Sequence, residues 1–237
     1  MEFNVTEKKA GENIREYALR VLRDNIMMMK LLPGMAIVEP EVTQFLGTSR
    51  TPVREACMRL AQDGLLEVFP QRGTYVTKID LEQVEESFFL RETMENAVMR
   101  LACRGVSQEA VYRLQDNLSM QRRCMEREEP LAFFRLDDDF HSLIYEACRK
   151  KRVWNVIAQA AHDYNRLRIM NVIEGSYEMK RIVTEHAKVF EAIKAQDFEA
   201  AEQFSSSNIK RIMNDVKMLY KKHPDYFLHY DTVVHET

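Results

Sequence analysis

Apolar residues recur at every third or fourth position over most of this chain, the spacing of a helix that buries one face. The first such stretch spans residues 12–29 and ends before a Pro-Gly pair. Two shorter stretches, 40–46 and 52–63, are each followed by a glycine, Gly47 and Gly64, the residue type that most often ends a helix. The pattern predicts three helices in the first quarter of the chain.

Two short apolar runs follow these helices. Residues 65–69 and 74–79 read as strands on either side of the turn 70–73, whose sequence is Pro-Gln-Arg-Gly. They predict a two-stranded hairpin with an arginine and a glycine at its tip. Most of the glycine and proline lies before residue 79, so we place a domain boundary there, with residues 1–78 as the first domain.

From residue 80 onward, long amphipathic stretches follow one another with few helix breakers. Asp80 and Ser107 stand where helix N-caps are expected. The pattern predicts a mostly α protein with an all-α bundle of about six helices in residues 79–222 and a tail in 223–237. The six expected helices span 81–103, 108–128, 130–150, 152–172, 176–196 and 197–222.

Composition narrows the class of protein. Of 237 residues, 46% are hydrophobic and 30% charged, which suits a globular chain rather than a disordered one. No apolar run reaches the ~20 residues of a membrane span, and no secretory signal is visible, so we expect no membrane association. The four cysteines form no metal-binding or disulfide pattern, which favours a reducing, cytoplasmic location. A net charge of -3 excludes a basic coat over the whole surface but not a local basic face.

The helix at 52–63 carries such a face. Thr51 is a plausible N-cap, with Pro52 at the first helical position. Arg50 and Arg54 lie opposite the apolar side of this helix. Helix, turn, helix and a basic-tipped hairpin make a winged helix-turn-helix, whose second helix enters the major groove of DNA. The alternative is an ordinary solvated face. The predicted DNA contacts are Ser49, Arg50, Thr51, Arg54, Arg72, Gly73 and Thr74.

These residues resemble the DNA-binding domain of GntR-family transcriptional regulators. The matching segments are GTSRTPVREA at 47–56, Arg59-Leu60, Asp63-Gly64-Leu65 and PQRGTYV at 70–76. The resemblance implies that Arg50, Thr51 and Arg54 contact operator DNA and that the wing glycine contributes. Where many members carry a basic residue early in the second helix, this chain has Pro40 and Glu41, which leaves the operator sequence open.

The predicted bundle places polar residues inside apolar helical arcs. Asp137 and His141 lie one turn apart in the arc of 130–150, and His186 lies in the middle of the arc of 176–196. One carboxylate and two imidazoles suit a divalent transition metal. The alternative is that each histidine is a satisfied core residue. Arg91 and Glu95 lie similarly in the first bundle helix, where Arg91 either binds a carboxylate ligand or pairs internally with an acid.

This second pattern resembles the C-terminal ligand-binding (FCD) domain of the FadR-like branch of the same family. Its Asp-x-x-x-His motif matches Asp137 and His141, its second histidine matches His186, and its third falls on Asn208. The resemblance implies that these four residues hold zinc, nickel or manganese and that a small organic acid completes the site. With Asn208 in place of histidine, the site is weaker, altered in its metal, or empty.

The same resemblance implies effector binding by the first bundle helix, where Arg91 and Glu95 match an Arg-x-x-x-Glu pattern. Arg166 and Arg168 are further candidates, of which we take Arg166 as an effector residue. The alternative is that both arginines lie on a solvated face.

Together these features predict a cytoplasmic homodimer that binds a palindromic double-stranded DNA operator, most simply as a repressor that a small carboxylate effector regulates. An enzyme using Asp137, His141 and His186 is the alternative from another class. We do not expect an enzyme, since the chain offers no clear general base. A sensor of acyl chains without metal is the third possibility, and the polar residues within the arcs speak against it.

Overall fold

A computed structural model describes residues 3–230, and for residues 206–214 it describes the backbone alone. The chain forms two compact units. Of the described residues, the first contains 3–82, 165–170 and 217–230. The second contains residues 83–164 and 171–216. The sequence pattern does not indicate that residues 165–170 and 217–230 pack with the N-terminal segment.

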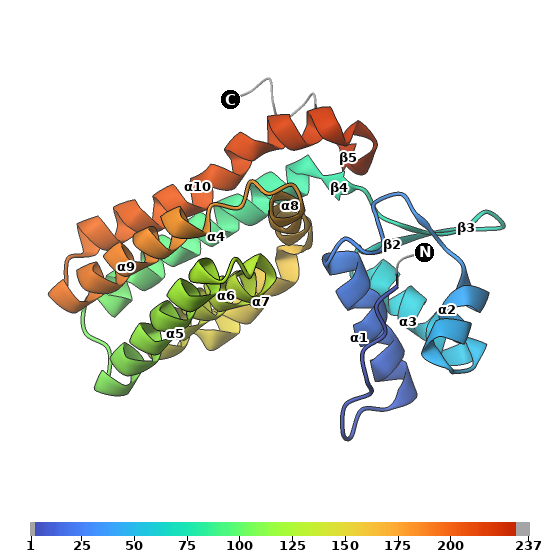
Figure 1. Ribbon diagram of the computed structural model, residues 1–237, viewed down its shortest axis with the longest axis horizontal. Coiled ribbons are helices and arrows are strands. Elements are labelled where there is room, and N and C mark those ends of the chain that lie inside the picture. Colours follow the sequence, from blue (N-terminus) through green and yellow to red (C-terminus); the bar gives the residue numbers. More distant parts are fainter. Residues whose placement is uncertain (1–2, 231–237) are drawn as a thin grey trace. The chain divides into compact units, whose positions relative to one another are not determined.

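The first unit contains the three predicted helices, α1 (Ile14–Met27), α2 (Glu39–Leu46) and α3 (Arg50–Gln62). A reciprocal capping box starts α1: the Asn13 side chain accepts from the Glu16 backbone N–H, and the Glu16 carboxylate accepts from that of Asn13. α1 and α3 lie side by side (Figure 1), and their apolar faces supply much of the core of this unit.

The start of α3 differs from the prediction. The helix begins at Arg50, so Ser49 occupies the N-cap position and makes no side-chain capping bond, while Thr51 lies within the first turn. Pro52 is then the third helical residue rather than the first. A helix tolerates proline there because the first four N–H groups have no partner within the helix.

The hairpin is one part of a three-stranded antiparallel sheet in the order β1-β3-β2. Its strands are β1 (Ala36–Ile37), β2 (Leu66–Phe69) and β3 (Gly73–Val76). The prediction missed β1 because two residues are too few to show alternation. At the tip, Gln71 and Gly73 both have positive φ angles, 62° and 120°, so the turn between β2 and β3 needs a residue without a Cβ at position 73.

The segment after the β2–β3 hairpin pairs with residues 227–228, far along the chain. β4 (Ile79–Asp80) pairs in parallel with β5 (Phe227–Leu228), which follows the short 3-10 helix Pro224–Tyr226. Asp80 also caps the next helix, as predicted, because its Oδ1 accepts from the Glu82 N–H at 3.0 Å. The residues from 223 to 230, predicted only as a tail, therefore belong to the first unit.

The described part of the chain continues in seven helices rather than six. Ser107 is an N-cap as predicted, since its Oγ accepts from the Ala110 N–H. α5 packs against both α6 and α9 (Figure 1). The helices are α4 (Leu81–Ala102), α5 (Gln108–Glu126), α6 (Pro130–Ala147), α7 (Lys151–Ala160), α8 (His162–Ile173), α9 (Met179–Ala195) and α10 (Phe198–Lys222).

The additional helix arises at Ala161, where the predicted 152–172 helix breaks into α7 and α8. Neither glycine nor proline marks this break, so the periodicity gave no sign of it. The Ser87 hydroxyl from α4 donates to the Ala160 carbonyl at 2.9 Å. This bond satisfies an acceptor that a helix end leaves without an internal partner, so tertiary packing stabilises the break.

Candidate functional site

α3 has a buried side and an exposed side. The buried side joins the core of the first unit through Val53, Ala56, Cys57 and Leu60. The exposed side carries Ser49, Arg50, Thr51, Arg54 and Met58. Arg50 has no ion-pair partner among the described residues, whereas Arg54 Nε lies 3.3 Å from Glu39 Oε2. The helix therefore presents two guanidinium groups to solvent on one face.

The wing presents a third cation. Arg72 and Gly73 are exposed at the turn between β2 and β3, and the Tyr75 hydroxyl donates to the Arg72 carbonyl at 3.0 Å. Thr74 does not belong to this exposed set, because only 8% of it is accessible. Side chains alternate along a strand, so the residue that follows an exposed Gly73 points inward. A DNA contact by the Thr74 side chain is not compatible with this burial.

In the second unit the structure brings together the three residues predicted to bind a metal. Asp137 and His141 come from α6 and His186 from α9, and all three are buried. One potential ligand atom from each lies within 4.8 Å of the others. We call Asp137, His141 and His186 the polar cluster. The fourth predicted ligand, Asn208, lies outside the described side chains.

Hydrogen bonds fix the tautomer of His186. Its Nδ1 lies 2.9 Å from Gln121 Oε1. The Gln121 amide nitrogen donates to Asn117 Oδ1 at 2.6 Å, so Oε1 is the acceptor and His186 Nδ1 carries the proton. Burial lowers the pKa of His186 to about 3, so the imidazole is neutral near pH 7. The Nε2 of His186 therefore bears a lone pair, and it lies 3.5 Å from Asp137 Oδ1.

The other histidine of the cluster is held by a carboxylate. His141 Nδ1 approaches Glu95 Oε1 to 3.1 Å, although not with the geometry of a hydrogen bond, and its Nε2 has no hydrogen-bond partner among the described residues. A carboxylate behind a histidine orients the ring and leaves the second nitrogen free as a ligand. Glu95 is fully buried and also accepts from the Ser205 hydroxyl at 2.8 Å.

Arg91 pairs internally with an acid, which was the alternative to ligand binding. Its Nε donates to Glu95 Oε1 at 2.9 Å, and its guanidinium lies over the rings of Trp154 and Tyr164. Burial alone would raise the pKa of Glu95, but the interactions of its carboxylate with His141 and Arg91 outweigh burial and lower that pKa well below its ordinary range. Glu95 is thus a carboxylate that connects Arg91 to the polar cluster.

Arg166 lies elsewhere. It is fully buried in the first unit, where Nη1 donates to the Thr77 carbonyl at 2.7 Å and Nη2 to the Lys78 carbonyl at 3.1 Å. Arg168 is also buried, so the solvated face considered for both arginines is wrong. Both terminal nitrogens of Arg166 are engaged by the backbone before β4, and the structure does not group this residue with Arg91 and Glu95.

Sequence reasoning missed Gln121 and Asn117, which orient the cluster. A signal for them was present, because α5 buries Leu114, Asn117, Leu118 and Gln121 at helical spacing. Two amides inside an apolar stripe require partners. Asn117 donates to the Leu136 carbonyl at 3.1 Å, next to Asp137.

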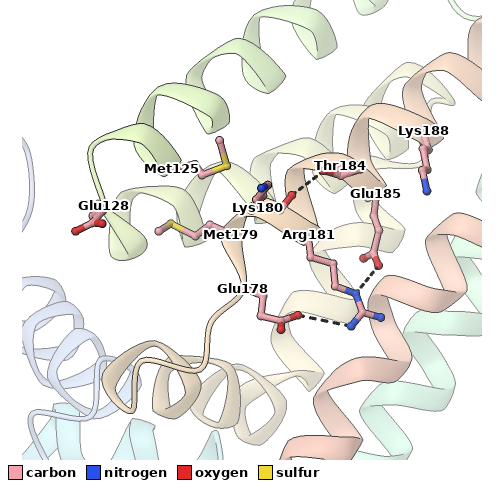
Figure 2. Close-up of a pocket in the computed structure, with 9 residues that line it drawn as sticks. All are labelled: Met125, Glu128, Glu178, Met179, Lys180, Arg181, Thr184, Glu185 and Lys188. Atoms are coloured by element: carbon pink, nitrogen blue, oxygen red, sulfur yellow. Dashed lines mark hydrogen bonds and ion pairs between the residues drawn. The ribbon is translucent and has the colours of Figure 1, made fainter.

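An open pocket of about 780 Å³ lies beside the start of α9 (Figure 2). Met125 and Met179 give it an apolar lining. Arg181 reaches between Glu178 and Glu185, with nitrogen–oxygen distances of 3.6 and 3.1 Å. Because both carboxylates neutralise Arg181, it is poorly suited to hold an anion. No member of the polar cluster lines this pocket. Because its arginine is already paired with two carboxylates, the pocket is the weaker candidate for an anionic ligand, and we take the polar cluster as the candidate site.

Comparisons with known families cover both parts of the chain. The model of the bacterial regulatory proteins of the gntR family matches residues 15–76, and that of the FCD domain matches residues 86–211. None of the helices in the described part of the chain has the length and apolar character of a membrane span.

Curated relatives agree with these matches. The chain is 32% identical to the HTH-type transcriptional repressor RspR of Escherichia coli K12, over 94% of this chain and 97% of that protein. It is 27% identical to a probable D-xylose utilization operon transcriptional repressor of Paenarthrobacter nicotinovorans, over 76% of this chain and 80% of that one.

Solved structures share the fold. E. coli McbR/YncC superimposes with a TM-score of 0.71 at 20% identity, covering 90% of this chain and 99% of that one. A GntR regulator from Rhodococcus sp. RHA1 gives 0.68 at 22% identity, covering 84% and 97%. With the winged helix-turn-helix before a helical FCD domain, the chain belongs to the GntR family and is a DNA-binding transcriptional regulator rather than an enzyme.

Proposed function

We propose that the chain is a repressor whose first unit reads operator DNA and whose second unit senses a small carboxylate through a divalent metal. RspR and the D-xylose operon regulator, both named as repressors, support repression. The operator contacts in this proposal are Ser49, Arg50, Thr51, Arg54, Arg72 and Gly73, all of them exposed. A homodimer would place two such faces on a palindromic operator.

The observation that carries the metal proposal is the set of lone pairs in the polar cluster. His186 Nε2 and Asp137 Oδ1 are both acceptors and lie 3.5 Å apart. Such a pair repels unless a proton or a cation lies between them. A single proton cannot also satisfy the Nε2 of His141, which has no described partner. One cation bound to all three groups would remove the repulsion between His186 Nε2 and Asp137 Oδ1 and would give the Nε2 of His141 a partner.

The donor set fits a borderline divalent metal. Two imidazole nitrogens and one carboxylate oxygen suit zinc, nickel or manganese and leave positions for further ligands. Gln121 and Glu95 behind the two histidines are the outer partners that such sites use. A bound metal would supply a positive charge for the carboxylate of an effector. Arg91 is paired with Glu95 beside the cluster, so in this proposal the metal, and not Arg91, supplies that positive charge.

Metal addition to chelator-treated protein tests this proposal. A ligand at about 100 times its Kd stabilises the native state by about 2.7 kcal/mol, which raises the melting temperature of a chain of this size by roughly 5–10 °C. We expect zinc, nickel or manganese to produce this rise in the wild-type protein and in His162→Ala, whose histidine lies outside the cluster.

His186→Ala and the nearly isosteric Asp137→Asn should abolish the rise. Asp137→Asn keeps the side-chain volume, so its result does not depend on tolerance of a cavity. If no metal copurifies with the wild-type protein and none of the three shifts its melting, the metal proposal is wrong, while the DNA-binding function remains.

A further inference from the structure

Arg50 and Arg54 differ in one respect although both are exposed on α3. Arg50 has no ion-pair partner in the described part of the chain, but Arg54 is paired with Glu39 on α2. Arg54 Nε lies 3.3 Å from Glu39 Oε2, with 71% of the arginine side chain and 30% of the glutamate side chain accessible. The pair therefore joins the first helical residue of α2 to the exposed face of α3.

The contact uses one particular edge of the guanidinium group. Arginine has five N–H donors in a rigid planar fork. Glu39 lies at Nε, so the terminal nitrogens Nη1 and Nη2 remain for a ligand. Two parallel N–H groups are the donors with which arginine binds guanine O6 and N7 in the major groove. The ion pair thus restricts the orientation of the Arg54 guanidinium group and leaves its Nη1 and Nη2 donors free to bind a base.

The position of Glu39 is itself well defined. Pro40 follows it and fixes φ in the first turn of α2, and a carboxylate at a helix N-terminus is favoured by the helix dipole. The Glu39 charge also acts on the buried side of α3. Burial raises the pKa of Cys57 to about 12, and the Glu39 charge adds to that rise.

The benefit of this pair is not stability. Exposed ion pairs contribute about 0–1 kcal/mol, and a carboxylate close to DNA weakens binding by repelling phosphates. A negative charge at this place lowers affinity for every DNA sequence and so needs a compensating role in the recognition of one sequence.

We propose that Glu39 is a positioning residue for operator reading, which orients Arg54 so that its Nη edge recognises one base pair. The inference rests on the proposed contact of Arg54 with operator DNA. It makes Glu39 a determinant of sequence specificity that touches the arginine and not the base.

The test measures binding to an operator and to random DNA by the full-length protein. The operator is selected from the DNA beside the protein's own gene. Glu39→Gln removes a charge that repels phosphate, so we expect affinity for random DNA to rise slightly. The ratio of operator to random affinity should fall by roughly tenfold, because a well-oriented arginine–guanine pair discriminates about 5- to 150-fold. Glu41→Gln is the matched control, since Glu41 is exposed in the same turn and has no described partner.

The control should raise both affinities equally and leave the ratio unchanged. In an Arg54→Ala background, Glu39→Gln should no longer alter the ratio. If Glu39→Gln, like Glu41→Gln, leaves the ratio of operator to random affinity unchanged, and Arg54→Ala lowers that ratio, the inference about Glu39 is overturned and the Arg54 contact stands. A fall that persists without Arg54 would overturn it as well, because Glu39 would then act directly on the DNA. An Arg54→Ala protein with an unchanged ratio would refute the Arg54 contact itself.

Discussion

Glu12 and Arg20 form a bidentate ion pair that connects the segment before α1 to that helix. Arg20 Nε and Nη2 donate to the two carboxylate oxygens of Glu12 at 2.7 and 2.9 Å, and Arg20 also bonds to Thr6 and to the Glu7 carbonyl. The hydrogen bond from Arg20 lowers the pKa of Glu12 to about 2. A single arginine thus organises residues 6–12.

This pair predicts a defined pH dependence. Because the folded pKa of Glu12 is depressed, its contribution to stability is complete above the ordinary value of 4.5 and is lost as the pH falls towards 2. We expect Glu12→Gln to melt at a lower temperature than the wild-type protein at pH 7 and to approach it as the pH falls below about 4. Thermal melts at several pH values check this, and a difference that stays constant from pH 7 to pH 3 would contradict the assignment.

At the residue scale, helix periodicity predicted burial but not contact. It placed Asp137, His141 and His186 inside apolar arcs, and all three are buried. It could not give the partner of each nitrogen, because the meeting of His186 with Gln121 depends on how α9 packs on α5. The sequence prediction also treated Thr74 as an exposed DNA contact. This was wrong because the sequence did not give the strand register that turns the residue inward.

At the scale of elements, the pairing of β5 with β4 is the feature that local sequence patterns indicate least. Each strand has two residues, and they lie almost 150 positions apart, Ile79 facing Phe227 and Asp80 facing Leu228. Pairing over such a distance follows from tertiary structure alone. The helix stops at Gly47 and Gly64 were predictable because glycine readily adopts the positive φ that both residues show. The break at Ala161 has no such residue, and the Ser87 hydroxyl donates to the Ala160 carbonyl there.

Two neighbours in β5 provide a matched test of this element. Phe227 is 5% accessible and packs near Tyr220, while 42% of Leu228 is accessible. We expect Phe227→Ala to lower the free energy of unfolding by about 3–5 kcal/mol and Leu228→Ala to change it by less than about 0.5 kcal/mol. Chemical denaturation measures both, and equal effects of the two variants would show that β5 is not packed as described.

At the scale of the whole molecule, the chain combines a DNA-reading unit with a helical unit that holds a buried polar cluster. In our proposal, an effector alters operator affinity only by as much as it binds two states of the protein differently. The same linkage makes operator DNA change effector affinity by an equal factor. The two domains were predictable because each carries its own motif, but the assignment of residues 165–170 and 217–230 to the first unit was not.

Operator binding by an Arg50→Ala, Arg54→Ala double variant is the measurement that bears most directly on DNA recognition through the exposed face of α3. Its control is Arg15→Ala, which removes an exposed arginine of α1 that pairs with Glu55. We expect the double variant to keep its melting temperature and to lose about 2–6 kcal/mol of specific binding, about 1–3 per base-reading arginine, while the control binds nearly as the wild-type protein does. A folded double variant that binds the operator with unchanged affinity and salt dependence would contradict this mode of DNA recognition.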